Sequence, residues 1–327
     1  MQILVTGSAG HLGEAIVRSL RGSGDEASGL DLRASPYTRW VGSIVDREFL
    51  RRCLSGVEAV VHTATLHKPH VATHGRQDFV DTNVTGTLNL LEEACRAGVR
   101  SFVFTSTTSA FGAALVPEDG APAAWITEDQ RPVSKNIYGV TKAAAEDLCH
   151  LFHRRQGLPC LVLRTSRFFP EEDDSAALRA AFAGDNAKAN EFLFRRVDLE
   201  DVVSAHLRAL ARAPEIGFAR YIVSATTPFT RDDLARLRHD APGVVAKLYP
   251  GYEAAYRRRG WRMFPGIDRV YVNAKARAEL GWTPAYDFAR VLGQIESGAP
   301  IGSALAREVG IKGYHDEVFA EGPYPVE

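Results

Sequence analysis

The feature that most constrains the fold of this chain is a glycine-rich turn near its N-terminus. A short apolar run, Ile3–Thr6, leads directly into Gly7-Ser8-Ala9-Gly10-His11-Leu12-Gly13, and a helical pattern follows. The first glycine permits a tight turn, the second lets a ligand approach the backbone, and the third lets the helix pack close to the strand. This order of strand, turn and helix is typical of a dinucleotide site, in which the pyrophosphate lies against the free N–H groups of the helix N-terminus.

The first 165 residues repeat this alternation of apolar runs and helical patterns. Because the runs are apolar at consecutive positions, we expect their strands to be buried on both faces, as in a parallel sheet. Right-handed βαβ units then predict a Rossmann-type, doubly wound α/β domain over residues 1–165. The expected strands are Ile3–Thr6, Ala27–Leu32, Ala59–Thr63, Phe102–Thr105 and Cys160–Arg164, and the expected helices lie near 11–21, 46–54, 78–97 and 138–156.

The pattern changes after residue 166, at a charged loop that is followed by Pro- and Gly-rich breaks. We expect residues 166–191 and 225–327 to form a smaller substrate-binding lobe, and elements from about 192–224 to return to the first sheet. In this half we expect a helix near 175–183, a polar stretch over 185–191, a strand at Phe192–Val197, a helix at Leu199–Ala211 and a strand at Phe218–Val223.

Charge and composition exclude several classes of partner. The 39 Lys and Arg residues against 40 Asp and Glu residues give a net charge of −1, which predicts no binding to nucleic acid or to an anionic membrane. No run of about 18 apolar residues predicts a membrane span. Neither the cysteines nor the histidines have metal-ligand spacing, so we expect free thiols, no metal and a cytoplasmic location. These residues are Cys53, Cys95, Cys149, Cys160, His62, His67, His70 and His74.

An acidic residue at the end of the second expected strand bears on the choice of cofactor. Asp31 lies 18 residues beyond Gly13, where a carboxylate accepts hydrogen bonds from the ribose of an adenosine. The same carboxylate repels a 2′-phosphate and therefore favours NAD over NADP. Arg33 weakens this preference, because an arginine there could neutralise that phosphate.

A tyrosine and a lysine on one expected helix are the candidate catalytic pair. Tyr138 and Lys142 are separated by one helical turn and share a face. A phenol with its ordinary pKa of about 10 is a poor base, and a neighbouring ammonium favours the phenolate. Tyr138 could then take a proton from a substrate hydroxyl as hydride leaves the adjacent carbon, or return it in the reverse step.

Hydroxyl side chains crowd the carboxyl end of the fourth expected strand, between Thr105 and Ser109. Ligands of open α/β sheets bind at this edge, so one of these hydroxyls could contact the reacting oxygen and help to position Tyr138. The pattern alone does not distinguish among them.

Together these residues resemble the extended short-chain dehydrogenase/reductase superfamily, in its NAD-dependent epimerase/dehydratase branch. Five further segments along most of the chain carry the same resemblance. They are Val61-His62-Thr63-Ala64-Thr65, Asn83-Val84-Thr85-Gly86-Thr87-Leu88-Asn89-Leu90-Leu91, Trp125-Ile126-Thr127-Glu128-Asp129, Arg196-Val197-Asp198-Leu199-Glu200-Asp201-Val202 and Leu280-Gly281-Trp282-Thr283-Pro284.

The resemblance implies a role for each matching residue. Counting back from Phe111-Gly112 places Thr107 at the catalytic Ser/Thr position, with Ser106 and Thr108 as alternatives, and it makes Tyr138 the acid/base and Lys142 its partner. It also implies a homodimer through the helices near 78–97 and 138–156. The implied NAD contacts are Gly7, Ala9, Gly10, His11, Leu12, Gly13, Asp31, Leu32, Arg33, Ser43, Ile44, Thr63, Ala64, Thr65, Asn83, Thr105, Tyr138 and Lys142; the implied substrate contacts are His67, Thr107, Thr108 and Arg167.

Three departures from the family pattern affect these expectations. Ser43-Ile44 stands where the adenine pocket usually has Asp followed by Ile or Leu. Thr108-Ser109 replaces the Asp-Glu pair of 4,6-dehydratases, which argues against elimination by that route. Arg167 lies near the position of a family asparagine, where a guanidinium suits a substrate carboxylate or phosphate but could equally pair with the acidic run that follows.

The sequence therefore predicts an NAD-dependent epimerase or dehydrogenase of a sugar or nucleotide-sugar. A dehydrogenase or reductase of a non-nucleotide carbonyl or uronate is the alternative within the same chemistry. A non-catalytic dinucleotide sensor is the alternative of another class, which the presence of Tyr138 and Lys142 disfavours.

Overall fold

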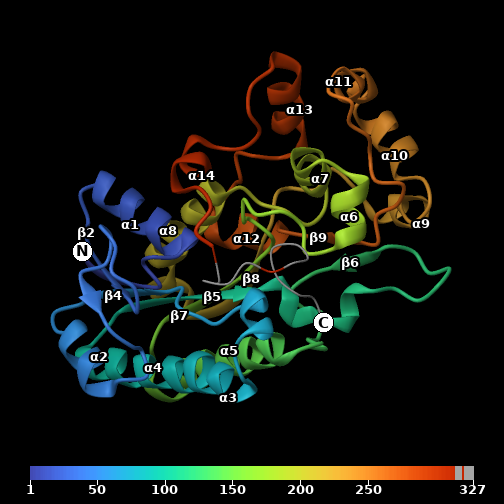
Figure 1. The fold of residues 1–327 in the computed structure, drawn as a ribbon. Helices are drawn as coiled ribbons and strands as arrows, with labels where there is room; N and C mark the ends of the chain where they lie inside the picture. Colours follow the sequence, from blue (N-terminus) through green and yellow to red (C-terminus); the bar gives the residue numbers. More distant parts are fainter. Residues whose placement is uncertain (314–318, 320–327) are drawn as a thin grey trace.

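A seven-stranded parallel sheet forms the centre of the protein (Figure 1), whose computed structural model describes residues 1–313 and Phe319. The strand order is β3-β2-β1-β4-β5-β7-β8, so the chain changes direction between β1 and β4. Ligands of such sheets bind beyond the carboxyl ends of the strands at this switch point. The strands are β1 (Gln2–Thr6), β2 (Glu26–Asp31), β3 (Trp40–Val41), β4 (Ala59–His62), β5 (Ser101–Thr107), β7 (Cys160–Thr165) and β8 (Phe218–Val223).

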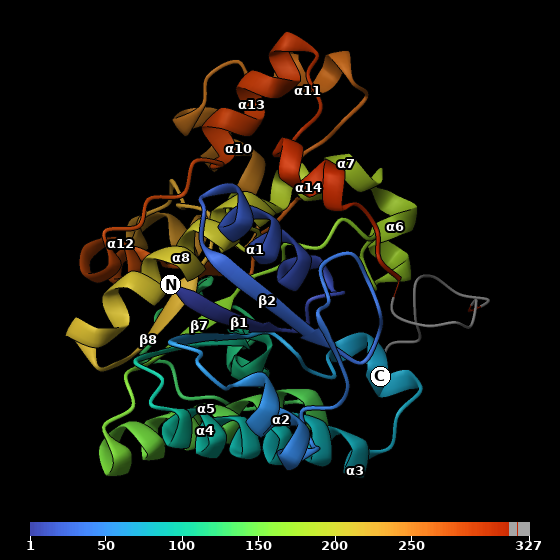
Figure 2. The same ribbon diagram turned by 90° about the vertical axis from the view of Figure 1, so that its left-hand side faces the viewer.

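Helices cover both faces of the sheet. Figures 1 and 2 show α1 and α8 on one face and α2, α4 and α5 on the other, which is the doubly wound arrangement that the sequence predicted. The helices of this part are α1 (His11–Gly22), α2 (Arg47–Cys53), α3 (Arg76–Phe79), α4 (Gly86–Ala97), α5 (Ile137–Gln156) and α8 (Leu199–Ile216).

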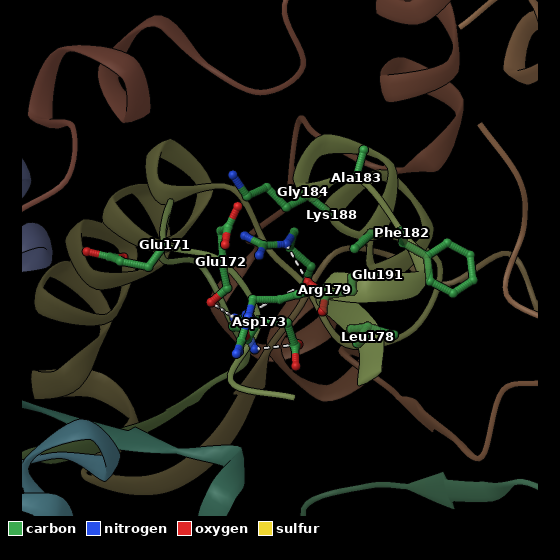
Figure 3. A pocket seen from close by; sticks show the side chains of 13 residues that line it. Glu171, Glu172, Asp173, Leu178, Arg179, Phe182, Ala183, Gly184, Lys188 and Glu191 are labelled. Carbon is green, nitrogen blue, oxygen red and sulfur yellow. Dashed lines mark hydrogen bonds and ion pairs between the residues drawn. The ribbon is translucent and has the colours of Figure 1, made fainter. Parts of the chain in front are cut away.

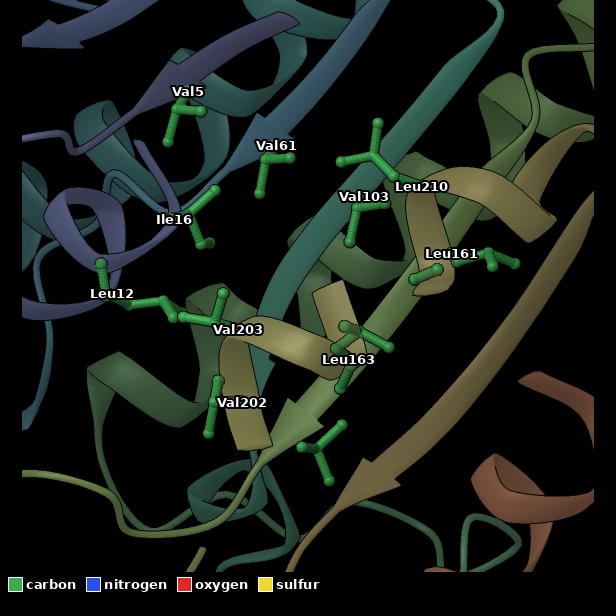
Figure 4. Close-up of a cluster of buried hydrophobic side chains, with 14 of the residues drawn as sticks. Val5, Leu12, Ile16, Val61, Val103, Leu161, Leu163, Val202, Val203 and Leu210 are labelled. Carbon is green, nitrogen blue, oxygen red and sulfur yellow. The ribbon is translucent and has the colours of Figure 1, made fainter. Parts of the chain in front are cut away.

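Except for the short edge strand β3, the strands of this sheet bury side chains, as the consecutive apolar residues predicted. On one face, strand residues such as Val5, Val61 and Val103 pack against Ile16 of α1 and Val203 of α8 (Figure 4). A second cluster fills the opposite face, between the alternate strand residues and the helices α2, α4 and α5. A sheet covered on both sides holds its strand ends rigidly, and the site is built on those ends.

A smaller lobe lies beyond the carboxyl edge of the sheet and has an apolar core of its own. Two short parallel strands, β6 and β9, pair at its base. The elements are β6 (Ala124–Ile126), α6 (Ala176–Ala181), α7 (Gly184–Glu191), α9 (Leu234–Leu237), α10 (Ala241–Leu248), α11 (Tyr252–Arg258), β9 (Arg269–Tyr271) and α13 (Phe288–Ser297). Two later helices, α12 (Ala274–Leu280) and α14 (Ala304–Val309), pack on the central sheet's side instead, because Ala276, Leu280 and Val309 belong to the cluster that α1 and α8 form with the sheet. The last residues of the expected 225–327 segment, 314–318 and 320–327, lie outside the described residues.

Short helical turns complete the chain, and one of them interrupts the helix expected over 78–97. There, α3 runs through a π-helical turn, η2, before α4 begins. The sequence of η2, Val-Asp-Thr-Asn-Val-Thr, is rich in β-branched residues, which lose side-chain freedom in a regular helix. The turns are η1 (Lys68–Ala72), η2 (Val80–Thr85), η3 (Thr108–Phe111), η4 (Ala113–Leu115) and η5 (Arg231–Asp233).

The expected strand at Phe192–Val197 is wrong. This segment continues α7 as a series of turns, and only Arg196 forms an isolated bridge, to Arg167. The apolar residues are buried all the same, because Phe192, Leu193 and Phe194 pack into the core of the lobe. The polar stretch over 185–191 belongs to α7. The short strands β3, β6 and β9 were not predicted.

Within the described part of the chain, no helix has both the length and the apolar composition required to cross a bilayer.

Candidate active site

The glycine-rich turn between β1 and α1 exposes its backbone because side chains do not fit there. Gly7 has a φ of +74°, and its N–H donates to Leu30 O at 2.7 Å, which ties the turn to β2. A Cβ on Gly13 would lie 2.0 Å from Gly7 O, so the helix approaches the turn as closely as only glycine allows. The turn thus leaves the N-terminus of α1 open to a phosphate group.

Asp31 lies beside this turn at the end of β2. Its Oδ2 accepts a hydrogen bond from Ala9 N at 3.0 Å, and its Oδ1 accepts one from Arg33 N at 2.9 Å. These bonds hold the carboxylate at the rim of the turn, where a ribose would meet it. The glycine cradle and the fixed carboxylate therefore fit a dinucleotide with an unmodified adenosine ribose.

A cavity of about 370 Å³ runs from the glycine turn to Tyr138 and Lys142 of α5. Seventeen of the eighteen implied NAD contacts line it, all except Asn83, and His67 lines it as well. Sequence reasoning missed several other lining residues, because their positions depend on packing and carry no motif. These are Leu30, Gly42, Leu66, His70, His74, Thr82, Ser106, Thr165, Phe168, Phe169, Lys312 and Gly313.

Asn83 is buried beside the cavity and does not line it, so its contact with the cofactor stays a prediction. Its side chain is buried, donates to Leu66 O at 2.8 Å and Thr141 Oγ1 at 3.0 Å, and accepts from Leu66 N at 2.8 Å. Asn83 thereby joins the loop after β4 to α5. It positions the wall of the cavity from behind.

Tyr138 and Lys142 lie on the first turns of α5, on the face that meets the sheet. Asn136 starts this helix by accepting from Gly139 N at 3.1 Å. Both side chains are buried. Burial raises the pKa of Tyr138 to about 12, and this effect is larger than the opposing effect of a hydrogen bond with Thr107. Burial lowers the pKa of Lys142 to about 7. The negative charge of Glu146 acts in the opposite direction but is the smaller effect.

The Lys142 ammonium has a prepared place. Its Nζ donates to Thr105 O at 2.6 Å and lies 4.0 Å from the centroid of the Phe104 ring. Glu146, one turn further along α5, is buried and accepts from Ser106 Oγ at 2.6 Å. The end of β5 and the first turns of α5 therefore form one hydrogen-bonded unit.

The structure separates the three hydroxyls that the sequence left as alternatives. Thr107 is hydrogen-bonded to Tyr138, and its Oγ1 also accepts from Ser109 N at 3.0 Å. Ser106 faces Glu146 instead, and Thr108 faces Thr165 O at 3.4 Å. Thr107 is thus the hydroxyl that the fold brings to Tyr138.

A second cavity, of about 330 Å³, meets the first at Tyr138. The two cavities share the lining residues His67, Tyr138, Thr165 and Phe169. All four expected substrate contacts, His67, Thr107, Thr108 and Arg167, line this second cavity. Lys68, next to His67, and Ser109, in the hydroxyl cluster after β5, line it as well. The sequence did not indicate the others that carry charge or hydrogen-bonding groups, because the folding of separate segments brings them to the cavity. These are Lys135, Asn136, Ser166, Glu171, Glu172, Asp174, Arg195, Arg269 and Tyr271.

Arg167 lines the second cavity and also pairs with the acidic run that follows it. Its Nη1 lies 2.8 Å from Asp173 Oδ2, and its Nη2 donates to Glu172 O at 2.9 Å. Arg195 bridges the same Asp173 and the buried Glu191, at 3.1 Å and 2.7 Å. Arg167 therefore lines a cavity that could hold a ligand, and it also pairs with the acidic run, as both expectations required.

A third cavity, of about 170 Å³, adjoins the second at Arg167, Glu171 and Glu172 (Figure 3). In Figure 3, Asp173, Arg179 and Glu191 gather at its centre, whereas Glu171 points away from them. The charged side chains balance in number: the cations are Arg167, Arg179, Lys188 and Arg196, and the carboxylates are Glu171, Glu172, Asp173 and Glu191.

His11 connects the cofactor turn to two distant segments. Its Nε2 lies 2.9 Å from Glu171 Oε1 and 3.1 Å from Lys312 N, which donates to it. Lys312 also pairs with Glu14 of α1. The chain after α14 thus lies against the glycine turn and forms part of the cofactor cavity.

No group of three or more His, Cys, Asp or Glu side chains suited to a metal ion occurs among the residues that the structure describes.

Comparison with known proteins decides the family. The model of the NAD dependent epimerase/dehydratase family matches residues 3–217, about two thirds of the chain. This chain belongs to that family.

Curated relatives and a solved structure agree with this assignment. A dTDP-glucose 4,6-dehydratase from Streptomyces niveus is 30% identical over 332 residues, covering 88% of this chain and 90% of the relative. Sterol demethylase protein B from Methylococcus capsulatus is 30% identical over 237 residues, covering 68% and 70%. A solved short-chain dehydrogenase/reductase superfamily protein from Agrobacterium tumefaciens, with bound NAD, is 25% identical with a TM-score of 0.66, covering 94% of this chain and 97% of that one.

The protein is therefore an NAD-dependent enzyme of the extended short-chain dehydrogenase/reductase type, on a Rossmann-type fold, as the sequence predicted. Its relatives act on more than one kind of molecule, so its own substrate has to be argued from its cavity.

Proposed function

We propose that this protein oxidises or epimerises a sugar or nucleotide-sugar, with Tyr138 as the acid/base and NAD as the redox cofactor. The observation that carries the proposal is the position of Tyr138 where the cofactor cavity meets the second cavity. A group at this junction can reach a substrate hydroxyl on one side and lie beside a nicotinamide on the other.

The glycine turn would hold the pyrophosphate, and Asp31 the adenosine ribose. The Asp31 carboxylate supports NAD over NADP, because it repels a 2′-phosphate. Ser43 and Ile44 would face the adenine. When bound, NAD⁺ accepts the hydride that leaves the substrate carbon.

Tyr138 would take the hydroxyl proton of the substrate. Its pKa of about 12 is too high for a base at neutral pH, so the positive ring of the bound cofactor and the Lys142 ammonium have to favour the phenolate. Thr107 would hold the reacting oxygen through the hydroxyl that also bonds Tyr138. In the reverse step Tyr138 returns the proton to the carbonyl oxygen.

Elimination of the 4,6-dehydratase type is not part of the proposal. That route uses an acidic pair just after the catalytic threonine, and this chain has Thr108-Ser109 there. Neither hydroxyl can replace a carboxylic acid as proton donor at neutral pH.

The first test is the substitution Tyr138→Phe, compared with Tyr249→Phe, a half-buried tyrosine in the core of the lobe. We expect Tyr138→Phe to lower turnover by about 10²–10⁴-fold and to leave NAD⁺ affinity within a few-fold of wild type. Tyr249→Phe should keep its activity. Substrate conversion that survives unchanged in Tyr138→Phe would refute the acid/base role and favour the non-catalytic alternative.

Net oxidation and epimerisation would use the same residues, so the two reactions have to be distinguished by their products. A dehydrogenase forms NADH in proportion to product, whereas an epimerase converts substrate without net NADH.

We also infer a cytoplasmic homodimer that uses the outer faces of α4 and α5. Val140 and Leu151 of α5 are exposed apolar side chains, which supports a contact there. A monomeric mass in solution would refute the dimer.

A further inference from the structure

Glu146 is a buried carboxylate that the chemistry proposed above does not use. It lies one helical turn beyond Lys142 on α5 and is 1% exposed. It is not among the described residues that line the three cavities, so any effect on the reaction has to pass through its neighbours. A buried carboxylate destabilises a fold unless hydrogen-bond donors surround it, and the donors around Glu146 show what it holds together.

Three neighbouring strands of the sheet supply these donors. Ser106 Oγ of β5 donates at 2.6 Å, Arg164 of β7 donates through Nε at 3.0 Å and through Nη2 at 2.8 Å, and Arg220 of β8 donates through Nε at 2.9 Å. Ser106 and Arg164 are register partners, so their side chains point to the same face of the sheet, which α5 covers. One carboxylate therefore ties α5 to β5, β7 and β8.

Ser106 lies in the middle of the strand end that meets the reaction site. Thr105, on one side of it, accepts from Lys142 Nζ through its carbonyl oxygen at 2.6 Å. Thr107, on the other side, is hydrogen-bonded to Tyr138. Because each peptide unit is planar and stiff, a shift of Ser106 against α5 would move both of these contacts.

A second buried carboxylate shows what a cluster without such a connection looks like. Glu93 of α4 is also 1% exposed, and it pairs with arginines of α2 and of α4 itself. These arginines are Arg47, Arg51 and Arg96. Glu146 differs from Glu93, because one of its donors, Ser106, lies on the strand end that meets the reaction site.

We propose that Glu146 is a positioning residue: through Ser106 it fixes the end of β5 against α5, and so holds the catalytic pair in place beside the cofactor. The inference rests on the proposed function, in which Tyr138 and Lys142 form that pair. It extends the site to a residue outside the cavities. Without the bond to Ser106, the strand end and the helix can shift against each other, and the contacts that favour the Tyr138 phenolate weaken.

The first test is Ser106→Ala, which removes the donor and leaves Glu146 paired with its arginines. Its control is Ser101→Ala, which removes a buried hydroxyl at the other end of β5, where it donates to Leu210 O at 2.8 Å. Calorimetric titration gives the Kd for NAD⁺. The pKa of Tyr138 in the NAD⁺ complex follows from the ultraviolet absorbance of its phenolate, measured against the same protein carrying Tyr138→Phe.

We expect Ser106→Ala to raise the Kd for NAD⁺ by about 3–10-fold and the pKa of Tyr138 by about half a unit or more, with neither change in Ser101→Ala. The pKa decides the test, because Ser106 itself lines the cofactor cavity and its loss could affect the Kd directly. An unchanged pKa in Ser106→Ala, or an equal rise in Ser101→Ala, overturns the inference.

Glu146→Met and Glu146→Gln test the carboxylate itself. Both variants lose the charge, but only Gln keeps an oxygen that can accept from Ser106. We expect the Kd for NAD⁺ to rise most in Glu146→Met and less in Glu146→Gln, while Glu93→Met keeps the wild-type value. Equal rises in the two Glu146 variants would overturn the route through Ser106. If loss of the pair with Arg164 prevents these variants from folding, Ser106→Ala decides, because it keeps that pair.

None of these measurements depends on substrate turnover, which separates the inference from the proposed function. Full turnover in Tyr138→Phe would refute the proposed chemistry and leave the comparison of NAD⁺ affinities intact. An unchanged pKa in Ser106→Ala would refute the positioning role, even where turnover depends on Tyr138.

Discussion

At the scale of single residues, the site depends on an ammonium that the fold buries at an energetic cost. Lys142 is only 2% exposed, and burial lowers its pKa from the ordinary 10.5 to about 7. Between these two values the unfolded chain binds a proton there that the folded, cofactor-free protein does not. Stability should therefore rise with pH across this window, and the cost of the buried charge is largest at pH 7 and below.

Lys142→Met should accordingly stabilise the cofactor-free protein while abolishing activity. We expect its Tm to exceed that of wild type by a few degrees at pH 6, and the difference to shrink towards pH 10 as wild-type Lys142 loses its proton. Thermal unfolding at several pH values measures this, with the exposed Lys247→Met as control. A difference that does not change with pH would contradict the buried charge as its cause.

At the scale of elements, α8 is the helix that joins the sheet to the lobe. Asp198 caps its N-terminus by accepting from Glu200 N at 2.8 Å, and the same carboxylate accepts from Ser303 N, at 2.9 Å, just before α14. Asp201, on the first turn, accepts from Ala285 N and Tyr286 N at 2.6 Å and 2.8 Å. One helix start thus holds two segments that lie far away in the chain.

Asp198→Ala should lower the free energy of unfolding by more than the loss of an ordinary helix cap does. The cap itself contributes about 0.5–2 kcal/mol, and the buried Ser303 N–H left without a partner adds about 1–3 kcal/mol. We expect a total of about 2–4 kcal/mol by denaturant unfolding. Among the described residues, the Asp287 carboxylate bonds only Arg290 N of its own helix, α13, so Asp287→Ala should lower the free energy of unfolding by about 0.5–2 kcal/mol. Equal losses in the two variants would mean that the contact with Ser303 contributes nothing.

At the scale of the whole molecule, the two ends of the described chain meet at the cofactor site. Lys312 N donates to His11 across 301 residues of sequence, and the Lys312 ammonium pairs with Glu14, which Arg18 also contacts at 2.7 Å. Since Lys312 and Gly313 line the cofactor cavity, this segment covers part of the turn that would hold the pyrophosphate.

Lys312→Glu should weaken NAD⁺ binding by repelling the segment from Glu14. We expect the Kd for NAD⁺ to rise by about 3–10-fold, while Tm changes little because Arg18 still pairs with Glu14. Calorimetric titration with NAD⁺ measures the effect, and Lys247→Glu makes the same charge change on an exposed part of α10. The same rise in Kd in both variants would point to net charge, and would exclude a closing role for Lys312.

The predictions for the cofactor half of the site rest on local patterns. The glycines of the 7–13 turn, Asp31 at a strand end and the one-turn spacing of Tyr138 and Lys142 could be read directly, because each depends on backbone geometry over a few residues. The strands of the sheet followed from runs that are apolar on both faces. The segment Phe192–Val197 was wrongly predicted as a strand because its residues are apolar. They are apolar because they are buried in the core of the lobe, and buried turns have the same composition as buried strands.

Patterns in the sequence were enough to predict the fold class and to locate the glycine turn, and they led to the prediction that Tyr138 and Lys142 form the acid/base pair. The folded structure was needed to see that Thr107, and neither of its neighbours, lies against Tyr138, that Asn83 bonds Thr141 beside the cavity, and that Lys312 lines the first cavity. These contacts join segments that are separate in the chain: Asn83 and Thr141 are 58 residues apart, and His11 and Lys312 are 301 residues apart. Such contacts arise from packing, and no local period in the sequence records them.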